Sequence, residues 1–225
     1  YHHGYMVPST GYLRWFALSP AEGGFTLQFP RRHNPTELQA PPHYAKLLTA
    51  FRLYGEIVVD YPRDLVALQT AHVGDFLLGQ STMLRDRVAQ VLPQWNATVP
   101  GYGYVLGMHA FGLEETALYA RAEETGRHAL DVNPRDPWAV HAVAHVMEMQ
   151  GRVGEGIGWL ESRIGDWATD NAFAYHNWWH LALYHLDLGD HGRALELYDT
   201  RIRPANSSVA MEMVDASALL WRLTL

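Results

Sequence analysis

The stretch LALYHLDLGDHGRALELYD, residues 181–199, decides the fold. On both sides of Gly189, apolar residues recur three and four positions apart, which is typical of two amphipathic helices. Gly189 marks a tight turn between them, because glycine readily ends a helix in a left-handed backbone conformation. Ala194 is small enough for the second helix to pack closely on the first. The stretch therefore predicts a helix–turn–helix unit.

Similar turns recur along the chain at a nearly constant spacing. They are centred on Gly79, Ala117, Gly151 and Gly189, at steps of 38, 34 and 38 residues. A period near 34 residues indicates tetratricopeptide helix pairs, which must stack to bury their apolar faces. We therefore predict an all-α, tetratricopeptide-type α-solenoid, in which antiparallel helix pairs build a right-handed superhelix.

The predicted helical repeat domain spans residues 44–225 and follows an irregular segment at residues 1–43. In that first segment Pro and Gly recur every few residues, which leaves room only for a short helix or strand pair. The repeat domain divides into four units and an end helix. These are predicted at residues 62–98, 101–134, 135–168, 171–203 and 208–223.

The composition excludes several classes of function. The chain has 225 residues, a formal charge of −7 and no cysteine. The negative charge argues against a nucleic-acid partner, and the lack of cysteine excludes disulfides and thiolate metal sites. No run approaches the roughly 20 apolar residues of a membrane-spanning helix, and no secretory leader is visible. We expect a cytoplasmic protein without a membrane partner.

A second stretch, HAVAHVMEMQGR at residues 141–152, indicates where the site lies. His141, His145 and Glu148 stand at offsets of zero, four and seven, so their side chains share one face of a helix. In tetratricopeptide units, this face of the first helix lines the concave wall. The same count predicts His, Glu and aromatic side chains at inward positions of the second and fourth units. The predicted hollow is lined by His141, His145, Glu148, His176, His180, Trp179, Tyr104, Phe111, Glu114 and Glu115.

The first functional hypothesis is a small-molecule pocket, with acid–base catalysis left open. Histidine titrates near neutral pH, and burial raises the pKa of a glutamate toward it. The predicted catalytic residues are His145 and His141, with Glu148 or Glu115 orienting the His145 ring. The predicted ligand-binding residues are His176, His180, Trp179, Tyr104, Phe111 and Glu114.

Two alternatives come from other classes of function. One is a protein-interaction scaffold that binds a peptide, the usual role of this repeat. The other is a Zn, Fe or Ni site, for which His141, His145 and His176 are the predicted ligands. The zinc-protease pattern is absent, because Ala142 follows the first histidine where that pattern has Glu. No cofactor is identified beyond this metal alternative, and exposed solenoid ends also favour a homo-oligomer.

The remaining histidines and a tryptophan pair carry weaker predictions. We expect His72 to be buried and paired with Asp75, and His185 to be structural, on the side of its helix opposite to His176. His128 and His191 are expected at the surface. In HNWWH, residues 176–180, the first tryptophan is predicted to lie in the core and the second, Trp179, in the pocket.

Several blocks resemble the tetratricopeptide repeat protein 38 family. HAVAHVMEMQGR, HNWWHLALYHLDLG (residues 176–189) and MEMVDASALLWRL (residues 211–223) occur in that order in the family, and the resemblance covers roughly residues 56–223. It implies a soluble α-solenoid. The family carries no assigned reaction, so the resemblance supplies no catalytic roles. Residues 1–43 depart from the helical pattern of the family.

Overall fold

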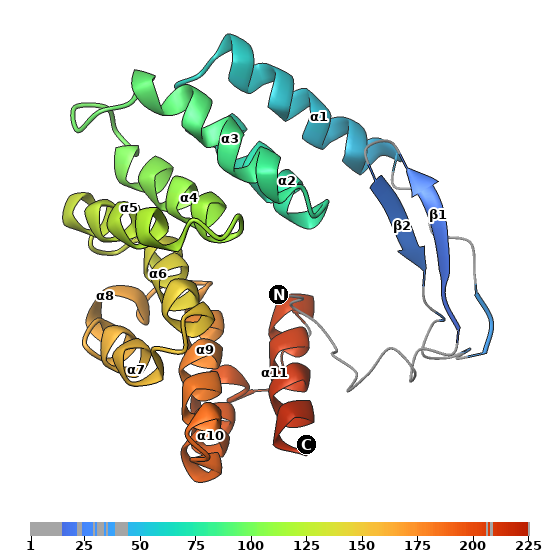
Figure 1. The fold of residues 1–225 in the computed structure, drawn as a ribbon, viewed down its shortest axis with the longest axis vertical. Helices are drawn as coiled ribbons and strands as arrows, with labels where there is room; N and C mark the ends of the chain where they lie inside the picture. Colours follow the sequence, from blue (N-terminus) through green and yellow to red (C-terminus); the bar gives the residue numbers. More distant parts are fainter. Residues whose placement is uncertain are drawn as a thin grey trace.

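The structure, a computed structural model, describes residues 15–21, 24–28, 30, 34, 36–38, 45–205, 207 and 209–224. Helices dominate these residues, which confirms the all-α class (Figure 1). The helices are α1 (Ala45–Asp60), α2 (Leu65–Leu77), α3 (Ser81–Val91), α4 (Tyr102–Glu114), α5 (Tyr119–Val132), α6 (Pro137–Met149), α7 (Val153–Glu161), α8 (Ile164–Trp167), α9 (Ala174–Asp187), α10 (His191–Leu197) and α11 (Ala210–Leu223), with a 3-10 turn η2 (Leu92–Gln94) and a π-helical turn η3 (Tyr198–Ile202).

A short hairpin lies within the segment that was predicted to be irregular. Strands β1 (Ala17–Ala21) and β2 (Gly24–Gln28) pair antiparallel, with Ala17 opposite Gln28 and Ala21 opposite Gly24. Most of the remaining residues of the predicted segment 1–43 lie outside the described part of the chain. No helix among the described residues is both long and apolar enough to cross a membrane.

The four predicted turns separate the helices of four consecutive pairs: α2 and α3, α4 and α5, α6 and α7, α9 and α10. The central residue of each turn has a positive φ, which is 67° at Gly79, 60° at Ala117, 68° at Gly151 and 76° at Gly189. A left-handed residue after a helix frees the chain to reverse while the last carbonyls remain hydrogen-bonded. The predicted repeat turns are therefore present in the structure.

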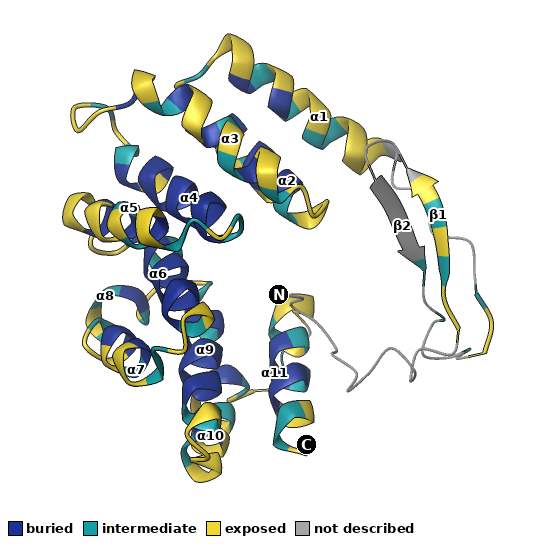
Figure 2. Ribbon diagram, in the orientation of Figure 1, coloured by how far each residue is buried: buried dark blue, intermediate teal, exposed yellow. Residues whose placement is uncertain are grey.

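The first helices of the pairs form the interior of the arc. In Figure 2, α4, α6 and α9 are buried along most of their length, whereas α5, α7 and α10 expose one face. A helix that is buried along most of its length does not need a polar face toward solvent. This explains why the apolar residues of α4 are spread around the helix and not confined to one side. The interior helices are therefore where polar side chains can be enclosed.

Tryptophans bind the later pairs together. Trp159 of α7 and Trp167 of α8 donate their indole N–H groups to the backbone oxygens of Val140 and Leu160, both at 3.0 Å. These hydrogen bonds satisfy the only polar atom that each indole ring takes into the core. Trp178 lies in the same core, 4.6 Å from the Trp167 ring, as predicted.

The end helix α11 returns to the inner side of the arc and lies beside α9 (Figure 1). Its buried face consists of Asp215, Ala216, Ala218 and Leu219, and it packs mainly on α9 and η3. An aspartate within an otherwise small and apolar face is unusual, because an ionised carboxylate is rarely buried without a partner.

Candidate functional site

Four imidazoles meet between α6 and α9. His141 and His145 stand one turn apart on α6, and His176 and His180 stand one turn apart on α9. All four are buried, with at most 5% of their surface exposed. Asp136 fixes the start of α6, because its carboxylate accepts a hydrogen bond from the Trp138 N–H at 3.0 Å and Pro137 occupies the first helical position.

The rings face one another through the same nitrogen. The Nε2 atom of His145 lies 3.0 Å from Nε2 of His180, and Nε2 of His141 lies 3.0 Å from Nε2 of His176. The Nε2 atoms of His176 and His180 are 3.2 Å apart. The four side chains can each offer one ligand atom, with all four atoms within 4.8 Å of one another. The arrangement is therefore a compact cluster of four nitrogen atoms, which we call the four-histidine centre.

Carboxylates hold the opposite nitrogen of three rings. Nδ1 of His145 lies 3.2 Å from Glu114 of α4, and Nδ1 of His180 lies 3.0 Å from Glu148 of α6. Nδ1 of His176 lies 2.6 Å from Asp215 of α11. The four-histidine centre and its three carboxylates thus come from four helices: α4, α6 and α9 of successive repeat units, and α11.

These carboxylates determine what the facing nitrogens can do. A neutral imidazole carries one proton, so a ring whose Nδ1–H donates to a carboxylate presents a lone pair at Nε2. In His145, His176 and His180 this would turn three lone pairs toward one point. Lone pairs at about 3 Å repel unless a proton or a metal cation lies between them. The cluster is therefore built for a positive charge at its middle.

Burial disfavours a free charge on the side chains themselves. Burial, followed by repulsion from the nearby His176, lowers the pKa of His145 to about 3. Burial also raises the pKa of Glu114 and of Glu148 to about 7, and Asp187 adds repulsion at Glu148. The largest cause of all three shifts is the same: each group would be charged in a medium that solvates charge poorly. An enclosed cation would reverse that balance for the carboxylates.

The distances suit a tetrahedral metal ion. With metal–nitrogen bonds of about 2.0–2.1 Å, the ligand nitrogens of a tetrahedral zinc site lie about 3.3 Å apart. Three of the six pairs of Nε2 atoms, at 3.0–3.2 Å, are close to that spacing, and all four ligand atoms lie within 4.8 Å of one another. Rings whose second nitrogen rests on a carboxylate are also typical of metal-binding histidines. A smaller group, formed by Glu114, Glu115 and His145, shares one of the same rings.

Aromatic side chains enclose the centre. The Phe111 ring lies 5.4 Å from that of His141 and 5.9 Å from that of His145, and Trp179 stacks on His176 at 5.3 Å and 19°. Trp138 and Phe173, which stack on each other at 3.9 Å, close a further side against His141. These walls keep water away and so strengthen electrostatic interactions inside.

Most predicted site residues lie at or beside this centre, and Tyr104 does not. Tyr104 is 43% exposed, at the far end of α4, where it lines an open surface pocket together with residues 97–103. Its prediction as a wall of the site is corrected. Glu115 is half-buried next to Glu114, and burial followed by repulsion from Glu114 raises its pKa to about 7. The metal alternative named three histidines, and the structure adds His180.

Three further histidines of the described residues, His72, His128 and His191, do not belong to the four-histidine centre. His72 is buried, and its pKa is lowered to about 4 by burial. It was predicted to pair with Asp75, but that carboxylate instead accepts two hydrogen bonds from Arg87, at 2.7 and 3.1 Å. Arginine matches both carboxylate oxygens, which an imidazole cannot do. His128 and His191 are exposed as expected.

Asp215 is the residue that the sequence analysis missed. The block MEMVDASALLWRL was interpreted only as a helix that covers the end of the repeats. A signal was present, because Asp215 stands on the apolar face of that helix, one and four positions before Ala216 and Leu219. A charged residue on a face that must be buried indicates a partner in the core.

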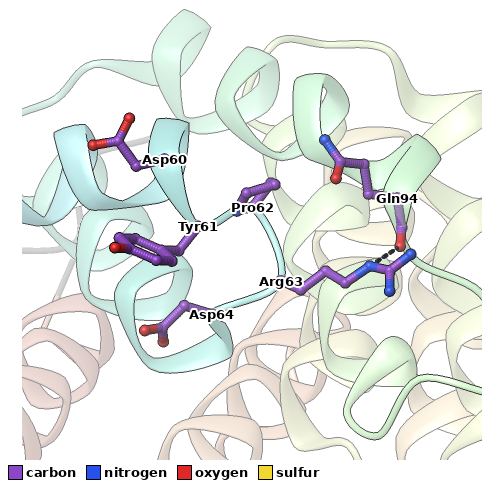
Figure 3. A pocket seen from close by; sticks show the side chains of 6 residues that line it. All are labelled: Asp60, Tyr61, Pro62, Arg63, Asp64 and Gln94. Carbon is purple, nitrogen blue, oxygen red and sulfur yellow. Dashed lines mark hydrogen bonds between the residues drawn. The ribbon is translucent and has the colours of Figure 1, made fainter.

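A separate pocket opens at the turn between α1 and α2. Figure 3 shows its lining by Asp60, Tyr61, Pro62, Arg63, Asp64 and Gln94. Arg63 spans it and donates to the backbone oxygen of Gln94 at 2.8 Å. None of the predicted site residues lines this pocket.

Comparison with known proteins defines the class of the chain. No family model matches it. A tetratricopeptide repeat protein from Parabacteroides merdae is similar, with 16% identity over 80% of this chain and 67% of that one, at a TM-score of 0.60. A thermophilic TPR protein in Thermus thermophilus is 19% identical over 78% of this chain and 92% of that one, at a TM-score of 0.59. Such identities establish the fold alone. The chain is a helical-repeat protein of tetratricopeptide type.

Proposed function

We propose that this protein binds one transition-metal ion at the four-histidine centre. The observation that carries the proposal is the convergence of four buried Nε2 atoms, with carboxylates holding the Nδ1 atoms of His145, His176 and His180. Imidazole nitrogen is a good ligand for Zn, Cu, Fe and Ni. Zinc suits the centre best, because it prefers four ligands in a tetrahedron.

The number of protein ligands indicates whether such an ion is catalytic or structural. Catalytic zinc sites keep one position open for water or substrate, whereas structural sites are closed by four protein ligands. Four imidazoles would close the sphere, which favours an ion that shapes the repeat array. Acid–base catalysis by His145 stays a prediction, but the carboxylate that contacts its Nδ1 atom is that of Glu114, whereas Glu148 contacts His180. Such catalysis competes with metal binding, because an ion would occupy the Nε2 lone pair that a proton shuttle needs.

Two further expectations remain part of the proposal. Membership of the tetratricopeptide repeat protein 38 family rests on the sequence blocks quoted above, and a cytoplasmic location rests on composition.

A peptide partner for the solenoid stays the second predicted function, supported by the usual role of the fold. It needs no metal, so the two functions can be tested separately.

Metal binding is tested with protein that has been stripped by a chelator, incubated with Zn²⁺ and separated from free ion. Elemental analysis should find about one equivalent of zinc in the wild type. His180→Gln removes one ligand and should bind far less. The matched control is His185→Gln on the same helix, where the ring lies 3.6 Å from Asp190 and outside the centre.

Two outcomes would contradict the proposal. Less than about a tenth of an equivalent in the wild type would mean that the centre holds only shared protons. Equal zinc content in His180→Gln and the wild type would place the ion elsewhere. Purification without metal-affinity resin avoids an ion acquired from the column.

A further inference from the structure

We infer that the end helix α11 is part of the metal centre: Asp215 positions the His176 ring, and the docking of α11 is coupled to occupancy of the centre. This inference rests on the proposed function, because it concerns the regulation of the same site. It assigns a role to a residue that lies 39 positions beyond His176 along the chain.

The first step is the contact itself. Asp215 is 2% exposed, and its carboxylate lies 2.6 Å from Nδ1 of His176. The residues beside it on the buried face, Ala216, Ala218 and Leu219, offer no charge. When α11 docks, it therefore carries a carboxylate out of water, and that step is unfavourable unless positive charge awaits it.

The second step is the charge that already surrounds the rings. Glu114 and Glu148 lie against His145 and His180, so docking of α11 adds a third carboxylate to the same enclosed region. The same helix also brings Arg222, whose positive charge acts on Glu148 but contacts none of the four rings. Like charges repel strongly where water is excluded. A divalent cation at the four Nε2 atoms would more than offset the charge that Asp215 adds. Occupancy of the centre therefore favours the docked helix.

The third step is the orientation of the ring. A metal on Nε2 leaves the proton of His176 on Nδ1, where it donates to Asp215. The same hydrogen bond holds the ring with Nε2 directed at the other three rings. Asp215 is thus a positioning residue, since it acts on the ion through His176.

A second contact of α11 involves Trp179, a neighbour of the His176 ring. The Arg222 guanidinium lies 5.4 Å from the Trp179 ring, and Trp179 stacks on His176. The main neighbours of α11 are α9 and η3, so its release would leave the helix pairs from α2 to α7 in place. An element with few neighbours can open locally while the remainder stays folded. By reciprocity, a docked helix should also strengthen metal binding.

The test is hydrogen exchange of the wild-type protein, measured with zinc-free protein and with protein saturated with Zn²⁺. Amides of Ala216–Leu219 should exchange more slowly with zinc, by about tenfold or more. Amides of α5, on the outer face of the arc, serve as the internal reference. This comparison needs no variant and decides the coupling even where a substitution impairs folding.

A pair of variants tests the role of the carboxylate. Asp215→Asn keeps a hydrogen-bonding side chain of the same shape and removes its charge, and zinc affinity should fall about 10- to 100-fold. Zinc should then slow the exchange of α11 less than in the wild type. Glu212→Gln, one turn earlier on the same helix, removes an equal charge that touches none of the four rings and should preserve both values.

The outcomes separate this inference from the proposed function. Stoichiometric zinc binding with unchanged exchange in α11 overturns the coupling and leaves the metal site standing. Wild-type affinity in Asp215→Asn overturns the positioning role. Failure of the wild type to bind zinc overturns the proposed function and this inference together.

Discussion

His145 and His180 belong to different repeat units, yet their Nε2 atoms lie 3.0 Å apart, and Nδ1 of each ring rests on a glutamate. The two glutamates select the tautomer, and the tautomer determines which nitrogen can accept a cation. Second contacts of this kind give a metal site much of its affinity, although they never touch the ion.

Glu148→Gln should lower the zinc affinity of the centre by about 10- to 100-fold. The amide keeps the size of the side chain but accepts a weaker hydrogen bond from His180 and carries no negative charge. Competition with a coloured chelator measures the change. Glu155→Gln is the control, because that side chain is 62% exposed and pairs with Arg152 on the outer surface. Equal affinities in the two variants would show that Glu148 does not support the site.

His72 should make the folded state sensitive to acid. Its pKa is about 4 when buried and 6.5 in the unfolded chain, so the unfolded state takes up the proton first as the pH falls. The stability that the neutral His72 ring contributes to the folded state is therefore fully present above pH 6.5, and it is lost as the pH falls toward 4. Between pH 7 and pH 5, His72 should cost about 2 kcal/mol of unfolding free energy.

Urea unfolding of the wild type and His72→Gln at both pH values checks this prediction. The variant should lose less stability between pH 7 and pH 5 than the wild type does. His128→Gln, at an exposed position of α5, should follow the wild type. An unchanged pH dependence in His72→Gln would mean that the ring reaches water in the folded state.

Gly156→Ala should destabilise the protein by about 1–3 kcal/mol. A Cβ at this position of α7 would run into the ring of Tyr184, whose hydroxyl donates to the Ala144 backbone oxygen at 2.5 Å. Gly158→Ala, on the same helix with open space around it, should gain up to about 1 kcal/mol from helix propensity. Thermal unfolding of both variants measures the difference, and equal melting temperatures would contradict it.

Ala117→Gly should stabilise the protein by about 0.5–1 kcal/mol. Ala117 has a φ of 60°, a left-handed conformation that costs a residue with a Cβ about 1–2 kcal/mol and costs glycine little. The reverse change at the corresponding turn, Gly151→Ala, should destabilise by about 1–2 kcal/mol. Denaturant unfolding checks both, and a destabilised Ala117→Gly would show that the chain entropy of glycine outweighs the strain.

The sequence predicts the solenoid well, because the repeat period and the turn residues are local signals. The spacing of His141 and His145 likewise predicts a shared face, since helical rotation follows directly from residue number. The spacing does not predict which residues of a neighbouring helix lie at the same height along the helix axis. Tyr104 illustrates the difference: it precedes Glu114 by ten residues, or about 15 Å of helix, and so lies far from the centre.

The contribution of α11 is harder to predict for another reason. Its return to the inner side of the arc depends on the path of the chain between η3 and α11, and no periodic signal describes that path. Asp215 could be recognised as a buried charge, but its partner could not be named. The direct approach of four Nε2 atoms also depends on how tightly successive units stack, which is a property of the assembled array.

The imidazoles that touch across the unit boundary, His141 with His176 and His145 with His180, are each 35 residues apart. In a stacked array, the stability of each unit depends on its own folding free energy and on its interfaces with the neighbouring units. The array can therefore unfold first at its weakest interface. An ion bound by histidines on both sides of this boundary would cross-link the third and fourth units. The third and fourth units would then melt as one block, and a pulling force would meet its greatest resistance there.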